Sequence, residues 1–240
     1  MTLVGDGLNS PRMQGGKEES VELQSPFPDK YVLRNSRVLK VSRAQINEVP
    51  MEVFELARQE LVNIVRLDGN QLMELPKDLT MLSELLNELD VTKNQISYVP
   101  TNISQFSKLS TLNLSCNLLC ELPMELAGLQ LLQYLDISYN RFDHLPRCIY
   151  ELESLETLLA HDNQIKSIDA SDMGLGGMKE LHSLNLKNND LQTVPPILGN
   201  LKNLKELELW GNPFRQPRHQ ILSMGTAEVL RYLRTRIPSN

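Results

Sequence analysis

Few side chains in this chain could do chemistry, and they are scattered rather than clustered. His161 and Asp162 form an adjacent base and acid, but neighbours along a strand are expected to point to different sides or to splay apart. No serine or cysteine is placed to complete a nucleophilic triad with them. Cys116 and Cys120 lack any familiar metal-ligand spacing. The sequence therefore predicts a protein that is not an enzyme and that has no metal and no cofactor.

Asparagine supplies a more regular signal. The segment "STLNLSCNLLCELP", residues 110–123, places Asn117 inside a run of leucines that ends on a proline. Three apolar residues precede an asparagine in the same way at steps of 24, 23, 23, 23, 26 and 23 residues along the chain. The marker asparagines are Asn70, Asn94, Asn117, Asn140, Asn163, Asn189 and Asn212. A degenerate first copy has Ala44 in the marker position, so the chain contains eight units.

A period of this length indicates a solenoid, in which each unit is a short strand followed by a return segment. The pattern LxxLxLxxNxLxxLP resembles that of the leucine-rich repeat proteins. With right-handed crossovers between parallel strands, it predicts an α/β leucine-rich repeat solenoid, a right-handed superhelix with a curved parallel sheet of about eight strands. We expect a disordered leader at residues 1–30, leucine-rich repeats at 31–212 and a C-terminal cap at 213–240.

The marker asparagine has a physical role in such a fold. After each strand the chain turns away from the sheet and leaves backbone N–H and C=O groups in an apolar interior, where each unpaired group costs about 1–3 kcal/mol. An asparagine amide offers two donor hydrogens and an acceptor oxygen, so stacked copies are expected to form a hydrogen-bonded ladder. The inward leucines are buried only when a neighbouring unit covers them, so no unit is expected to fold alone.

Alternate strand residues are expected to face the concave side of the arc. A solenoid presents its broadest rigid surface there, and we interpret this face as the site for a protein partner whose identity the sequence leaves open. The candidate residues are Asp90, Tyr134, Asp136, Tyr139, His161, Asp162, Asn185, Lys187 and Trp210. Their acids and aromatics suit a basic or polar protein segment, and a merely solvated polar face remains the alternative.

The C-terminal segment departs from the repeat. Residues 225–238 predict a capping helix with Thr226 as its N-cap. The apolar face of this helix, which would cover the last repeat, consists of Val229, Leu230, Leu233 and Ile237. Residues 213–240 also hold five arginines and one acid, Glu228. An alternative function is therefore an accessory or targeting module whose arginine-rich cap contacts an anionic surface, although arginine stems that cover an apolar cap are the simpler explanation.

The run from residue 211 to 238 resembles the C-terminal part of a longer intracellular member of the leucine-rich repeat family. Net charge and composition agree with that class. A charge of -6 and a sequence pI near 5.3 argue against nucleic acid as a partner. An odd number of cysteines, three, favours a reducing compartment, so we expect a cytoplasmic protein and leave the nucleus open as a second location. No apolar stretch reaches the roughly 18 residues of a transmembrane segment.

Overall fold

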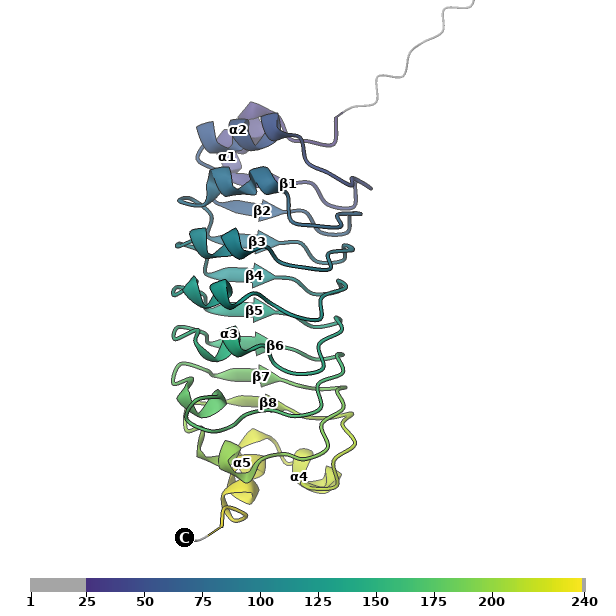
Figure 1. Ribbon diagram of the computed structural model, residues 1–240, viewed down its shortest axis with the longest axis vertical. Coiled ribbons are helices and arrows are strands. Elements are labelled where there is room, and N and C mark those ends of the chain that lie inside the picture. Colours follow the sequence, from purple (N-terminus) through teal and green to yellow (C-terminus); the bar gives the residue numbers. More distant parts are fainter. Residues whose placement is uncertain (1–24, 239–240) are drawn as a thin grey trace, which may run out of the picture.

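The computed structural model describes residues 25–238 and contains eight short strands in one parallel sheet (Figure 1). Each strand pairs with the next in chain order, and the central residues of neighbouring strands lie opposite each other, as Leu112 and Leu135 do. The strands are β1 (Val38–Lys40), β2 (Ile64–Arg66), β3 (Glu88–Asp90), β4 (Thr111–Asn113), β5 (Tyr134–Asp136), β6 (Thr157–Leu159), β7 (Ser183–Asn185) and β8 (Glu206–Glu208). The predictions for residues 1–24 of the leader and for residues 239–240 lie outside the described residues.

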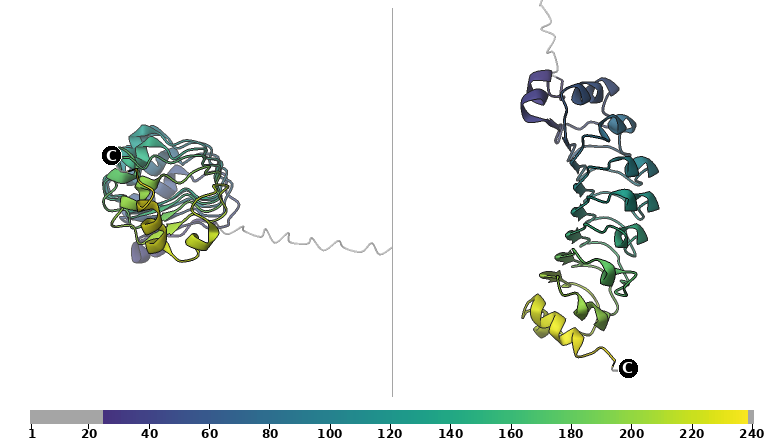
Figure 2. Two further views of the ribbon diagram at one scale, coloured as in Figure 1. Left: turned by 90° about the horizontal axis from the view of Figure 1, so that it is seen from below. Right: turned by 90° about the vertical axis from the view of Figure 1, so that its left-hand side faces the viewer.

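The period-2 pattern of each strand decides which side faces the core. The central residue of every strand is buried, from Leu39 in β1 to Leu207 in β8, while its two neighbours face the other side of the sheet. The core therefore lies between the sheet and the return segments. Figure 2 shows the coils stacked along a gently curved arc with the strands on its inner side. The predicted solenoid of eight parallel strands is confirmed.

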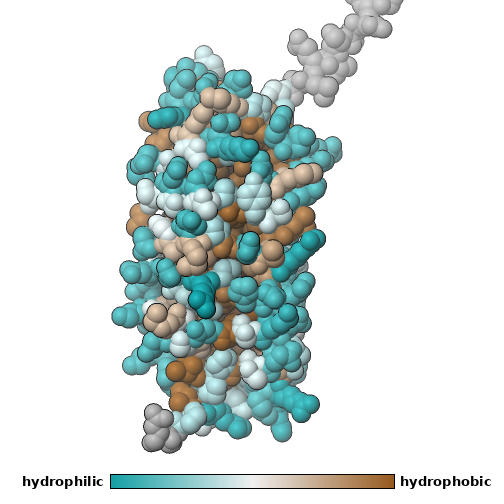
Figure 3. Space-filling model, viewed as in Figure 1, coloured by the Kyte–Doolittle hydropathy of each residue, from teal (hydrophilic) through white to brown (hydrophobic). Residues whose placement is uncertain are grey.

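Short helices form the outer side of the arc. In six coils the proline of the repeat pattern stands directly before such a helix, because its fixed φ suits the entry to a turn and its missing N–H would have no partner there. The helices between strands are α2 (Met51–Gln59), α3 (Arg147–Tyr150) and the 3-10 helices η1 (Lys77–Leu82), η2 (Thr101–Gln105), η3 (Met124–Gly128), η4 (Leu175–Gly177) and η5 (Pro196–Asn200). Figure 3 shows this convex face, with hydrophilic side chains over most of it and hydrophobic groups between them.

The marker asparagines form the predicted ladder. Asn117 Oδ1 accepts the backbone N–H of Ile96 at 3.0 Å, and its Nδ2 donates to the carbonyl oxygens of Val91 and Leu114 at 3.0 Å each. The other six markers make the same pair of connections, one to their own coil and one to the coil before. Each amide thus joins two coils and satisfies buried backbone groups of both.

The N-terminal end is closed by a cap that the sequence did not reveal. Helix α1 (Lys30–Ser36) begins after Asp29, whose carboxylate accepts a backbone N–H of the first turn at 2.9 Å, and it buries Leu33 completely. Arg34 of α1 forms an ion pair at 2.8 Å with Glu60, which follows α2. The hydrogen bond from Arg34 holds the pKa of Glu60 below its ordinary value. Helix α1 and helix α2 therefore cover the degenerate first unit around Ala44.

The C-terminal cap consists of α4 (His219–Leu222) and α5 (Thr226–Arg234), so the capping helix is shorter than the sequence predicts. The prediction of Thr226 as N-cap is wrong. Gly225 takes that position, and the Thr226 hydroxyl instead accepts the backbone N–H of Leu207 at 2.9 Å. This N–H lies on the open edge of β8, where no ninth strand supplies an acceptor. Three residues of the expected apolar face are buried, and Ile237 lies beyond the helix.

Candidate protein-binding surface

Four side-chain positions of each coil line the inner face of the solenoid. They are the first and third residues of the strand and the second and third residues after it, for example Thr157, Leu159, His161 and Asp162 in the coil of β6. Corresponding positions of neighbouring coils lie side by side because the strands are in register. On the concave face, the four positions of one coil therefore form a row, and equivalent positions of successive coils form a column.

The last of these four positions has a left-handed backbone in every coil, with φ between 52° and 73°. Its occupants are Arg43, Gly69, Lys93, Cys116, Tyr139, Asp162, Asn188 and Gly211. The residue that follows is the marker asparagine or, in the first coil, Ala44. A positive φ reverses the chain sharply, so the marker amide points into the core while the residue before it projects from the concave rim. The structure thus adds a constraint that the repeat pattern does not show.

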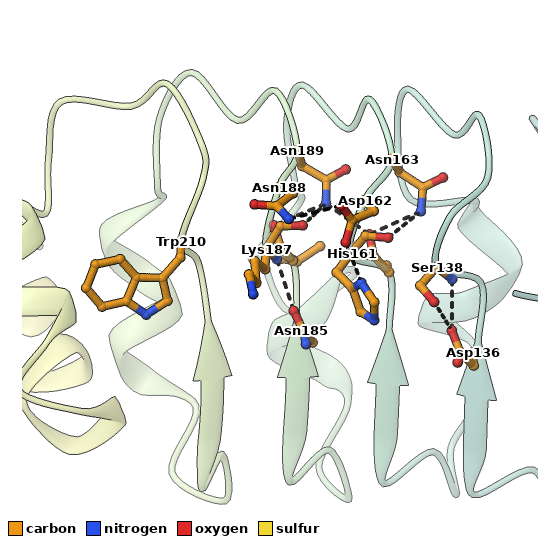
Figure 4. A network of polar contacts seen from close by, with 12 residues as sticks. Asp136, Ser138, His161, Asp162, Asn163, Asn185, Lys187, Asn188, Asn189 and Trp210 are labelled. Atoms are coloured by element: carbon orange, nitrogen blue, oxygen red, sulfur yellow. Dashed lines mark hydrogen bonds and ion pairs between the residues drawn. The ribbon is translucent and has the colours of Figure 1, made fainter. Parts of the chain in front are cut away.

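Four concave residues meet in a polar cluster on neighbouring coils, and Figure 4 labels three of them, His161, Asp162 and Asn188. His161 Nδ1 lies 2.8 Å from Asp162 Oδ2, and because a carboxylate only accepts hydrogen bonds, this nitrogen is the donor. Asn188 Nδ2 donates to Asp162 Oδ1 at 3.0 Å. The ring of Tyr139 meets the His161 ring edge-on, with centroids 5.2 Å apart. We call Tyr139, His161, Asp162 and Asn188 the concave cluster.

This geometry corrects the expectation that His161 and Asp162 splay apart. A regular strand would separate them, but the φ of 54° at Asp162 turns its carboxylate back onto the histidine. The sequence also missed Asn188, although it occupies the position before a marker asparagine, as Tyr139 and Asp162 do. Extending that register along the chain would have found it.

Hydrogen bonds keep the Asp162 carboxylate of the concave cluster ionised. Partial burial by itself would raise the pKa of Asp162, but the hydrogen bonds from His161 and Asn188 outweigh it and leave the pKa below its ordinary value. The negative charge of Asp162 in turn raises the pKa of Tyr139. The cluster therefore presents an ionised carboxylate beside a neutral phenol, and the Tyr139 side chain is 53% exposed.

Three other predicted residues mainly serve the turn after the strand. Asp136 is 7% exposed, and its Oδ1 accepts the backbone N–H of Ser138 at 2.9 Å and the Ser138 hydroxyl at 2.6 Å. Asp90 and Asn185 accept the backbone N–H two residues further on in the same way, at 2.9 and 3.1 Å. Hydrogen bonds within the turn occupy these side chains, so they are less available to a partner than the sequence suggests.

The remaining predicted residues lie around the cluster. Tyr134 is half-buried, and its burial raises its pKa. Lys187 is exposed, and its ammonium has no ion pair within residues 25–238. Trp210 stands apart from the cluster (Figure 4), with its ring 5.3 Å from the His219 ring of α4. Trp210 thus connects the concave face to the C-terminal cap.

The N-terminal end of the concave face has a different character. Lys40, Arg43 and Arg66 line a hollow there together with four polar or acidic residues of the first three coils. Arg66 Nε lies 2.8 Å from Glu88 Oε1, so this pair is already neutralised. The face therefore changes from mixed basic and acidic residues at β1–β3 to aromatic and acidic residues at β5–β6.

Cys116 and Cys148 are not activated nucleophiles. Burial raises the pKa of Cys148 to about 12, and desolvation also raises the pKa of Cys116. Within residues 25–238 no group of three or more histidine, cysteine or acidic side chains is arranged to hold a metal ion. The helices in this part of the chain are also too short or too polar to cross a membrane.

Comparison with known proteins decides the family. The family described as leucine-rich repeat region matches residues 103–237. The chain belongs to this leucine-rich repeat family. The mouse leucine-rich repeat serine/threonine-protein kinase 1 is 26% identical over 226 residues, which are 88% of this chain but only 10% of the length of that relative.

Solved leucine-rich repeat structures share the fold. A leucine-rich repeat protein of Leptospira interrogans superposes with a TM-score of 0.59 at 23% identity, over 86% of this chain and 62% of the other. The ectodomain of the Arabidopsis thaliana membrane receptor kinase GASSHO1/SCHENGEN3, solved in complex with CASPARIAN STRIP INTEGRITY FACTOR 2, has a TM-score of 0.58 at 26% identity. That match covers 70% of this chain and 23% of the receptor chain. This fold is typical of protein-protein interaction modules.

Proposed function

We propose that this protein is a non-catalytic interaction scaffold that binds a protein partner on its concave face. The concave cluster is the observation on which the proposal rests. Tyr139 is exposed in the turn after β5, at the rim of the concave face, and lies in the same cluster as the ionised Asp162. An aromatic ring held in place next to a fixed charge supplies contact area at low entropic cost and selects a complementary polar or basic segment.

The relatives support the class of function but not a specific partner. The matched kinase shares only a tenth of its length with this chain, so its activity is not carried over. We also propose, from the resemblance of residues 211–238, that the chain is related to leucine-rich repeat-containing protein forty. The proposed location is the cytoplasm, and the nucleus is left open as a second location. All three cysteines are free thiols, which agrees with a reducing compartment.

Site-specific photo-crosslinking in cells tests the proposal. A benzoylphenylalanine at Tyr139 retains an aromatic ring at the concave rim, and one at Tyr98 serves as the matched control, because Tyr98 is 47% exposed on the return segment after β3. We expect a defined protein to be crosslinked from position 139 and not from position 98. Mass spectrometry of the crosslinked band identifies this protein.

A blocking substitution separates specific docking from chance contact. Thr157→Arg places a long charged side chain in the centre of the concave face without touching the core, since Thr157 is the first residue of β6 and faces inward to the arc. Thr101→Arg makes the same change on the convex side. Loss of the crosslink with Thr157→Arg but not with Thr101→Arg supports the proposal. An equal yield with both variants, or equal crosslinking from positions 139 and 98, contradicts it.

A further inference from the structure

A small hollow in the C-terminal cap lies outside the concave cluster. It has a volume of about 180 Å³ and is bounded by the end of β8, the loop after it and α4. Three basic side chains line it, Arg215, Arg218 and His219, and no carboxylate does. This is a concentration of positive charge in a protein whose net charge is -6.

The arginines of this hollow have no partner in the described part of the chain. Elsewhere in the cap, Arg231 pairs with Glu228 at 2.6 Å, and Arg236 lies over the Tyr232 ring at 5.2 Å. Arg215 and Arg218 have no carboxylate within 4.0 Å among residues 25–238. Neighbouring cations without a counter-charge repel each other, and a bound anion would remove this repulsion.

The walls of the hollow are held in place by other contacts. The Asn212 amide closes the marker ladder, donating to the carbonyl oxygens of Leu186 and Leu209 and accepting the N–H of Leu191, so it is not free to collapse into the space. The Trp210 ring lies against the His219 ring at 5.3 Å and restricts its position. The Asn212 and His219 sides of the hollow are therefore held in place, and the exposed side chains of Arg215 and Arg218 line the rest of it.

We propose that this hollow binds the phosphate group of a phosphate-bearing ligand. Its volume is about six times the ~30 Å³ that a water molecule takes in the liquid. It is below the roughly 300 Å³ at which pockets for drug-sized ligands begin, so the hollow accommodates a tetrahedral oxyanion rather than a whole nucleotide. Arginine is the residue best suited to bidentate recognition of phosphate. This site lies outside the concave cluster and adjoins the proposed protein-binding face only through Trp210, whose ring packs on His219.

Two sources could supply that phosphate, a free phosphate compound or a phosphorylated lipid headgroup. Trp210 is the single tryptophan of the chain and reports on the site through its contact with His219. Its fluorescence is followed during titration with inorganic phosphate at constant ionic strength, with chloride as the reference anion. A second arm measures co-sedimentation with phosphatidylcholine vesicles that contain or lack phosphatidylinositol 4-phosphate.

The full chain carrying Arg215→Gln and Arg218→Gln is compared with a control carrying Arg231→Gln and Arg236→Gln, which removes the same charge away from the hollow. We expect saturable binding that weakens at least tenfold in the first variant and less than twofold in the control.

Binding of inorganic phosphate identifies a soluble source, and binding only to phosphoinositide vesicles identifies a lipid source. Equal weakening in both variants overturns the site, as does wild-type protein that saturates with neither probe. If the first variant fails to fold, the Trp210 fluorescence titration of the wild type with phosphate and with chloride still tests whether the site prefers phosphate.

Discussion

Asp136 shows that an acid on the concave face can act chiefly within the fold. Its carboxylate satisfies the buried backbone N–H and hydroxyl of Ser138. Asp136→Ala leaves both groups unpaired, and we expect the free energy of unfolding to fall by about 1–3 kcal/mol. Asp136→Asn keeps an acceptor oxygen, as Asn113 does for Ser115 at 3.0 and 2.7 Å, and we expect a loss below about 1 kcal/mol. Urea denaturation of the two variants measures the difference, and equal losses would contradict this role.

Asp162 is expected to make stability depend on pH in the acid range. Its pKa is lowered in the folded protein, so its contribution to stability is fully present above the ordinary value near 3.8 and is lost as the pH falls through the lowered pKa. Asp162→Asn removes this titration. Thermal melts between pH 5 and pH 2, a range of about three units around the ordinary aspartate pKa, should show a flatter decline for Asp162→Asn than for the wild type. Asp172→Asn, an exposed change of the same charge, is the control, and parallel curves for Asp162→Asn and the wild type would refute the assignment.

At the level of elements, the sequence predicts the repeated features and the C-terminal capping helix but misses the N-terminal cap. Every strand and every marker amide follows from the spacing of leucine and asparagine, because burial and backbone satisfaction impose the same demand on each coil. The left-handed position before the marker is hidden, since arginine, lysine, cysteine, tyrosine and aspartate all occupy it. Helix α1 is also hidden, because it covers an edge that occurs once and so has no period.

The Thr226 hydroxyl gives a testable prediction for the C-terminal edge of the sheet. Thr226 accepts the backbone N–H of Leu207 at the free edge of β8, so Thr226→Val should leave that N–H without an acceptor. We expect a loss of about 1–3 kcal/mol and faster amide exchange at Leu207. Thr226→Ser retains the hydroxyl and should exchange at nearly the wild-type rate. If both variants exchange alike, the contact does not protect the edge.

For the whole molecule, the sequence predicts which residues lie on the concave face better than it predicts which of them are available there. All nine proposed residues belong to the concave side or its margin by register, and register follows from the repeat. Their availability depends on side-chain direction and hydrogen bonding, as the burial of Asp136 and the distance between Trp210 and the concave cluster show. These properties arise from contacts between coils, which a pattern within one coil does not encode.

The amide ladder makes a final prediction about how the solenoid holds together. Asn117 lies in the middle of the stack and is 6% exposed, so Asn117→Ala leaves the N–H of Ile96 in the neighbouring coil without its acceptor. The carbonyl oxygens of Val91 and Leu114 each lose one of two amide donors and keep those of Asn94 and Asn140. We expect the free energy of unfolding to fall by about 1–3 kcal/mol, since one buried N–H loses its only acceptor.

Asn212 makes equivalent bonds at the C-terminal end of the ladder but is only half-buried, so water can replace its amide there. Asn212→Ala should therefore cost less than Asn117→Ala, and its effect on hydrogen exchange should stay within the last coil and the cap. Asn117→Ala should instead raise exchange in the coils on both sides of β4, because each unit is stable only against its neighbours. Equal costs and equally local exchange for the two variants would show that the coils are stabilised by leucine packing alone, without a contribution from the ladder.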